Sequence, residues 1–152
     1  MDESVTRQRE LAESLARRVH HGIKDKSGAP YIDHPRRVAA KLAEPRAQVV
    51  AWLHDVLEDT ETSEDELRVQ FDGTIMDAVV ALTKIEGEAP ESYYARVRAN
   101  GLALQVKLAD IHDNLDPARL ALLDAPTANG FMAKYGRALM ALSGEQVIKR
   151  EA

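Results

Sequence analysis

Apolar residues recur at intervals of three and four along most of the chain, which is the spacing of an amphipathic helix. In residues 4–21, for example, Leu11, Leu15 and Val19 would share one face of a helix, and Gly22 is a natural stop. No stretch alternates apolar and polar residues at period two, so the pattern predicts no β-sheet. We therefore expect an all-α protein. Further helices are predicted over residues 35–42, 45–57, from Ser63 onward, and over 75–82, 91–98, 102–115 and 128–142.

The helix expected from Pro45 is apolar nearly all round, which is typical of a central, buried helix. Ser63 and Glu66 have the spacing of a capping box at the start of the next helix. Residues 22–31 are polar and punctuated by Gly and Pro, so they are predicted to form a loop. Since the sequence shows no repeat, low-complexity tract or linker, we expect a single domain over residues 1–152.

Composition narrows the class of protein. Among 152 residues there is no cysteine, which excludes disulfides, thiolate metal sites and thiol nucleophiles. A net charge of −5 argues against broad nucleic-acid binding, which depends on excess Lys and Arg. No apolar run has the length of a membrane span, and the acidic start of the chain is not that of a signal peptide. We expect a cytoplasmic protein that binds neither membrane nor nucleic acid; its oligomeric state is left open.

The charge is distributed unevenly. Residues 54–92 carry two basic and twelve acidic side chains, whereas the flanking segments are net basic. One interpretation is a solvated acidic face. The other is a carboxylate-rich site for a hard cation, facing basic groups that bind an anion.

Three clusters carry candidate chemistry. His54 and Asp55, followed by Glu58 and Asp59, lie at the end of the most apolar predicted helix. Buried charges need partners, and a metal ion would supply one; the alternative is a helix end that emerges into solvent.

The second cluster surrounds His34, which lies where a loop meets a helix. From this position His34 is either a metal ligand or a capping or surface residue.

The third cluster is a polar stripe in the helix predicted over residues 102–115. Lys107, Asp110 and Asn114 follow one another at helical spacing beside the apolar face of that helix. Such a stripe is either exposed to solvent or lines a pocket.

Taken together, four blocks of sequence resemble a known family. "GAPYIDHP", "LHDVLEDT", "ALTK" and "VKLADIHDNL" resemble, in the same order, the hydrolase domain of the RelA/SpoT family and the small stand-alone alarmone hydrolases, which belong to the HD superfamily of metal-dependent phosphohydrolases. The resemblance runs from about His20 to Leu115. It implies the helical HD-domain fold and removal of the 3′-pyrophosphate from guanosine tetra- or pentaphosphate, a small phosphorylated nucleotide.

The resemblance also implies roles for particular residues. The implied metal ligands are His34, His54, Asp55 and Asp110. Mn²⁺ is the usual ion in the family, with Fe, Co, Ni or Mg as alternatives, and two imidazoles with two carboxylates suit a six-coordinate ion. Glu58 and Asp59 match the catalytic acidic pair that orients and deprotonates the attacking water. Lys26 and Asn114 match residues that contact the substrate.

Two departures from the family pattern affect substrate recognition rather than the metal ligands. Asp25 stands where the family usually has Arg, and Ile111 replaces the Arg of the family's Asp-Arg-Leu-His-Asn. The first predicts weak activity on guanosine tetraphosphate, improved by Asp25→Arg. Two other functions stay open: an HD-type phosphatase acting on another nucleotide or small phosphate ester, and a non-catalytic helical module that senses a nucleotide.

Overall fold

The protein is described by a computed structural model covering residues 3–143, and these residues form helices and no strand beyond one isolated bridge between Lys24 and Pro30. The expected all-α fold is confirmed. The expected domain also included residues 1–2 and 144–152, which lie outside the described residues. The helices are α1 (Glu3–Val19), α2 (Asp33–Ala40), α3 (Pro45–Leu53), α4 (Val56–Asp59), α5 (Glu64–Arg68), α6 (Gly73–Leu82), α7 (Pro90–Arg98), α8 (Gly101–Asn114), α9 (Pro117–Leu120) and α10 (Ala125–Ser143).

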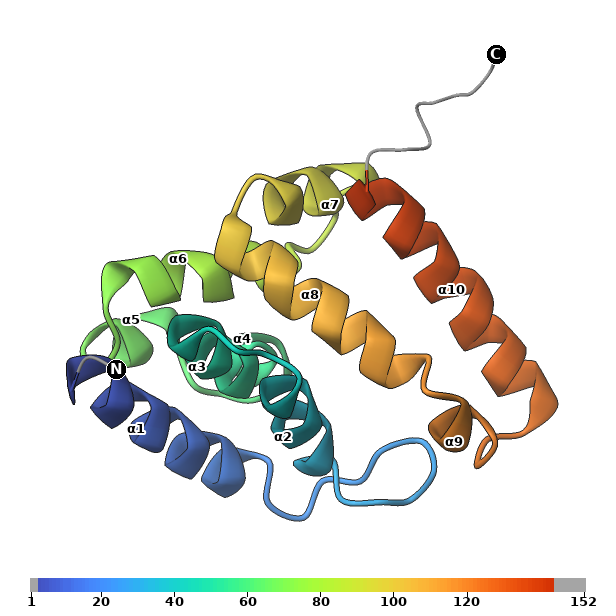
Figure 1. The fold of residues 1–152 in the computed structure, drawn as a ribbon, viewed down its shortest axis with the longest axis horizontal. Coiled ribbons are helices and arrows are strands. Elements are labelled where there is room, and N and C mark those ends of the chain that lie inside the picture. The colour runs from blue at the N-terminus through green and yellow to red at the C-terminus, as the bar shows by residue number, and fades with distance from the viewer. Residues whose placement is uncertain (1–2, 144–152) are drawn as a thin grey trace.

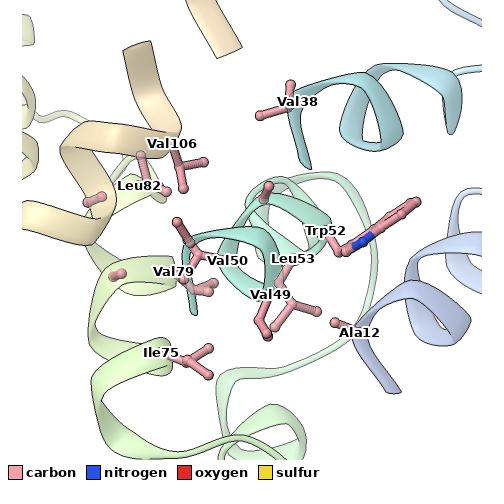
Figure 2. Packing of buried hydrophobic residues seen from close by; sticks show 14 of the residues in the cluster. Ala12, Val38, Val49, Val50, Trp52, Leu53, Ile75, Val79, Leu82 and Val106 are labelled. Carbon is pink, nitrogen blue, oxygen red and sulfur yellow. The ribbon is translucent and has the colours of Figure 1, made fainter. Parts of the chain in front are cut away.

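Helix α3 lies at the centre of the fold, where it contacts α1, α2, α6 and α8 (Figure 1). Its apolar residues from Val49 to Leu53 are all buried, which confirms the expected central helix. Figure 2 shows Val49, Val50 and Leu53 packed among side chains of the surrounding helices. Burial of each such side chain contributes about 1.5–3 kcal/mol, so this helix anchors the chain segment that follows it.

Helix α8 is the second organising element. It contacts α2, α3, α6 and α7, and α10 runs alongside it (Figure 1). Ala103, Val106 and Ile111 are buried in the same core as α3. The polar stripe of α8 is thereby turned toward α2 and the chain that follows α3.

Most helix boundaries differ from the predictions by one to three residues, and the differences at α2 and α3, together with an additional helix α9, have clear physical reasons. The helix that begins at Pro45 ends at Leu53 instead of Leu57, because the backbone leaves α-helical geometry at Asp55, directly after the C-cap residue His54. Helix α2 begins two residues before Pro35, which lies in the first turn, where backbone N–H groups have no helical partner. Helix α9 was not predicted, although Asp116 and Pro117 form a recognisable start: the Asp116 carboxylate accepts a hydrogen bond from the N–H of Ala118.

The predicted capping box is confirmed. Ser63 Oγ accepts a hydrogen bond from the N–H of Glu66, and the Glu66 carboxylate accepts one from the N–H of Ser63. Among the described helices, none combines the length and the apolar character needed to cross a bilayer.

Candidate functional site

A pocket of about 330 Å³ lies where α8 and α10 face residues 24–31 and the break between α3 and α4. Most of the residues singled out by the sequence line it. Those that do are Lys26, His34, His54, Asp55, Glu58, Asp110 and Asn114. Asp59 does not line this pocket.

Three of the four expected metal ligands meet at the bottom of the pocket. His34, His54 and Asp110 are buried, and each offers a ligand atom within 4.8 Å of the other two. His34 Nε2 lies 2.8 Å from Asp110 Oδ1, and His54 Nε2 lies 3.7 Å from the same oxygen. Asp55 stands at the edge of this group, with Oδ2 3.2 Å from His54 Nε2, and accepts a hydrogen bond from the Tyr31 hydroxyl.

The break after α3 explains how adjacent residues reach one site. In a continuous helix, neighbours such as His54 and Asp55 would point in directions about 100° apart. Here the helix ends at Leu53, and Asp55 has φ −108° and ψ 0° before α4 begins. Because the backbone departs from helical geometry at Asp55, the Asp55 side chain lies beside that of His54, on the side of the helix end that faces Asp110.

His54 provides the test of whether a cation fits. Its Nδ1 lies 2.7 Å from the carbonyl oxygen of Ala51, and since a carbonyl only accepts, Nδ1 carries the proton. The lone pair on Nε2 therefore faces the carboxylates of Asp55 and Asp110, and this buried nitrogen has no hydrogen-bond partner. A buried lone pair opposite two carboxylates is an unfavourable arrangement that a divalent cation would satisfy, so the residues present fit a metal ion.

The carboxylates of the site are electrostatically distinct. Burial and the nearby Asp110 carboxylate raise the pKa of Asp55 well above its usual value. Burial also acts to raise the pKa of Asp110, but the hydrogen bond between Asp110 and His34 and the charge of Lys107 hold it well below its usual value. For His34, burial lowers the pKa, and the hydrogen bonds to Asp110 and Asp113 outweigh that effect and raise it.

The polar stripe of α8 lines the pocket instead of facing solvent. Lys107 Nζ lies 3.2 Å from Asp110 Oδ2, and the Asn114 amide donates to Asp110 Oδ1 at 3.3 Å. Asp110 is therefore held between its helical neighbours at i−3 and i+4. Asn114, which is expected to contact the substrate, therefore also contacts the candidate metal ligand Asp110.

Glu58 and Asp59 differ in their surroundings. Glu58 is exposed at the pocket, where its Oε1 accepts a hydrogen bond from the N–H of Lys84 at 2.8 Å. Asp59 is its neighbour on α4 and is also exposed. The geometry favours Glu58 over Asp59 as a group that can reach a substrate or water in the pocket.

The loop that carries Lys26 is organised by Asp25. Asp25 Oδ1 accepts hydrogen bonds from the N–H of Ser27 and of Ala29, and Gly28 follows with φ +90°. Such side-chain acceptors stabilise tight turns. Asp25→Arg would remove these bonds, so the structure argues against the improvement expected from that substitution.

Sequence reasoning did not assign roles to several residues that complete the site. Asp113 accepts a hydrogen bond from His34 Nδ1 at 2.7 Å, and Arg119 donates to the same carboxylate at 2.9 Å. A signal was available for Asp113, which lies one helical turn after Asp110. The outer pocket adds side chains from distant segments, for which the sequence offers no local signal. They are Tyr94, Phe131, Lys134 and Tyr135.

Comparisons with known proteins agree with the geometry. A model of the HD domain family matches residues 12–108. The chain is 39% identical over 132 residues to a GTP pyrophosphokinase of Streptomyces antibioticus, a match that covers 78% of this chain and 16% of that protein. It is 36% identical over 114 residues to a guanosine-3′,5′-bis(diphosphate) 3′-pyrophosphohydrolase of Aquifex aeolicus, covering 69% of this chain and 16% of that protein. The chain thus spans a small part of these longer relatives.

A solved structure shares the fold. The protein, described as a metazoan ortholog of SpoT that hydrolyses ppGpp, superposes with a TM-score of 0.71 at 21% sequence identity. The superposition covers 90% of this chain and 86% of that one. With the family match over residues 12–108, it confirms the resemblance seen in the sequence. The chain belongs to the HD domain family.

Proposed function

We propose that this protein is a metal-dependent nucleotide phosphohydrolase that removes the 3′-pyrophosphate from guanosine tetra- or pentaphosphate in the cytoplasm, with Mn²⁺ as its cofactor. The observation that carries the proposal is the unpartnered Nε2 of His54, which faces two carboxylates at the bottom of a pocket. Two longer relatives with matching segments bear names for guanosine tetraphosphate metabolism, which supports this choice of substrate.

The cation would be held by His34, His54 and Asp110, with Asp55 beside His54 as the fourth ligand. A bound divalent cation lowers the pKa of water and offsets phosphate charge. Glu58, fixed at the pocket by the N–H of Lys84, would accept the proton of the attacking water. Lys107 would keep Asp110 anionic, since its ammonium group lies 3.2 Å from that carboxylate.

The outer pocket suits a nucleotide with phosphate groups. Lys24, Lys26, Lys84 and Lys134 line it together with Arg119. Burial and the charges of Lys84 and Lys107 lower the pKa of Lys134, and a bound anion would relieve this crowding of positive charge. Tyr94, Phe131 and Tyr135 offer aromatic surface for a base. Because these groups converge in one pocket, they favour a small molecule over a nucleic acid.

A second candidate function is hydrolysis of a different phosphorylated nucleotide. Asp25 favours it, because this carboxylate lines the pocket and is tied to its own loop and to Arg119 at 3.5 Å. An acidic group at a position where the family usually has Arg changes the contacts available to the substrate.

The test is a product assay on a panel of nucleotides with Mn²⁺, and with Fe, Co, Ni or Mg in its place. We expect GDP and pyrophosphate from guanosine tetraphosphate, and loss of turnover together with metal content in His54→Ala. His112→Ala is the matched control, because His112 is exposed and does not line the pocket.

Turnover of another nucleotide in preference to guanosine tetraphosphate would support the second candidate. Tight metal binding with no turnover on any nucleotide would contradict both and indicate a sensing module.

A further inference from the structure

We propose that Asp113 is a positioning residue for the metal centre, acting through His34; the proposal rests on the metal site proposed above. Asp113 lies on α8 one turn after Asp110 and is fully buried, with 0% of its surface exposed. It is not among the residues whose atoms converge on the candidate cation position. Asp113 therefore acts on the site through the side chains that it contacts.

The contact with His34 determines which ring nitrogen faces the metal position. Asp113 Oδ2 lies 2.7 Å from His34 Nδ1, and because an ionised carboxylate only accepts, Nδ1 is the donor. The other ring nitrogen, Nε2, points to Asp110 at 2.8 Å, which is the side where the ligand atoms gather. A carboxylate behind a ligating histidine selects the tautomer and the ring orientation and increases the basicity of the ligating nitrogen.

Three cations hold Asp113 in its charged form. Arg37 Nε lies 2.8 Å from Oδ1, Arg119 Nη1 lies 2.9 Å from Oδ2, and Lys41 Nζ lies 3.5 Å from Oδ1. Arg37 comes from the same helix as His34, whereas Arg119 comes from α9. A buried carboxylate without such partners would be strongly unfavourable, so these contacts are what permits an anion behind His34.

The two histidines of the site are supported differently. His54 Nδ1 is bound by the main-chain carbonyl of Ala51, which no substitution of a side chain removes. The corresponding support of His34 is a side chain, so its contribution can be measured by mutation.

Asp113→Asn is the principal test, because asparagine has nearly the same shape and can still accept from His34 Nδ1 while it lacks the charge. We expect the Kd for Mn²⁺, measured by calorimetric titration of the protein with the metal alone, to rise about 10–100-fold. The same substitution is then made in a His34→Gln background, titrated at Mn²⁺ concentrations high enough to saturate the weakened site so that a Kd is obtained; it should produce no further loss there, since the residue through which it acts is gone. Asp116→Asn is the control, because Asp116 caps α9 without contacting His34. The Mn²⁺ affinity of this variant should equal that of the wild type.

Three outcomes would overturn the proposal. Wild-type affinity in Asp113→Asn, or an equal loss in both His34 backgrounds, would show that Asp113 serves the fold only, and would leave the proposed function standing. Absence of Mn²⁺ binding by the wild type would overturn the proposed function and this role with it. If Asp113→Asn does not fold, Arg37→Gln replaces it: we expect a smaller loss of Mn²⁺ affinity that again vanishes in the His34→Gln background, and its persistence there would contradict the role.

Discussion

Single atoms decide the chemistry of this site. His54 Nδ1 donates to the main-chain carbonyl of Ala51, and His34 Nδ1 donates to Asp113. The remaining nitrogen of each ring, Nε2, is directed at Asp110. The site therefore presents two imidazole nitrogens beside carboxylate oxygens, a donor set suited to a divalent transition metal. Glu58 differs from these residues, because it is exposed and its fixed contact is the N–H of Lys84.

Glu58→Gln should separate proton transfer from metal binding. Glutamine retains an oxygen that can accept from the N–H of Lys84, so the local structure should persist, but it cannot take a proton from water. We expect near-wild-type Mn²⁺ content and a fall in kcat of about 10²–10⁴-fold, the usual contribution of a positioned general base. Steady-state kinetics with elemental analysis makes the measurement.

Asp59→Asn is the comparison for Glu58→Gln, since Asp59 is adjacent but does not line the pocket. It should reduce kcat less. If Glu58→Gln removes the metal, Glu58 is a ligand; if Asp59→Asn has the larger effect on kcat, the proton acceptor is Asp59.

At the scale of elements, the outer wall of the pocket depends on how α6 is joined to α7. Arg96 of α7 donates hydrogen bonds to the carbonyl oxygens of Val80, Ala81 and Thr83 at the C-terminal end of α6, where carbonyl groups lack the full set of helical partners. Glu88, in the connection, accepts from Arg96 at 2.6 and 2.9 Å. Lys84 lies in the same connection between α6 and α7, so these contacts also fix the position of the Lys84 N–H that donates to Glu58.

Glu88 should make the stability of this connection depend on pH. Its hydrogen bond from Arg96 lowers the pKa of Glu88 to about 2, against an ordinary value of 4.5. Because the folded-state pKa is depressed, the contribution is fully present above about pH 4.5 and is lost as the pH falls toward 2. Glu88→Gln should therefore lower Tm at pH 7, with the difference from wild type shrinking toward pH 2.

Thermal unfolding across this pH range, followed by circular dichroism, makes that comparison. Glu86→Gln, an exposed neighbour, should match the wild type throughout. A constant Tm difference between Glu88→Gln and wild type from pH 7 to pH 2 would contradict the assignment.

At the scale of the whole molecule, the bound metal would couple the core to the pocket. The candidate ligands come from α2, from the end of α3 and from α8, three segments distant in sequence that meet around the central helix. A cation bound to all of them stabilises the folded chain, since the unfolded chain does not bring them together.

Mn²⁺ should therefore raise the melting temperature. At a free concentration 100 times its Kd, the ion stabilises the native state by about 2.7 kcal/mol, or about 5–10 °C for a domain of this size. Differential scanning calorimetry should show the increase in wild type and in His112→Ala, its reversal by a chelator, and little increase in His54→Ala. An equal shift in His54→Ala would place the stabilising ion elsewhere.

The helical architecture follows from local signals in the sequence, namely the periodicity of apolar residues and the turn and cap residues. The sequence located α3 as the buried helix and the capping box at Ser63, and its motifs identified residues that the structure brings together at His34, His54 and Asp110. It left open whether the acidic stretch of residues 54–92 is solvated or forms a cation site; Glu64 and Asp65 are exposed on α5, whereas Asp55 lines the pocket.

The arrangement of those residues depends instead on contacts between segments that are distant in the sequence. The break after Leu53 departs from a helical pattern that continues through Leu57, because burial and the contacts of His54 and Asp55 outweigh local periodicity. The contact between His34 and Asp113 joins residues 79 positions apart, and the lysines of the outer pocket come from separate segments. Such contacts depend on the packing of α2 and α8 against α3 and of α10 against α8. The spacing of residues within one segment carries no information about the distance between two segments that meet only when the chain folds.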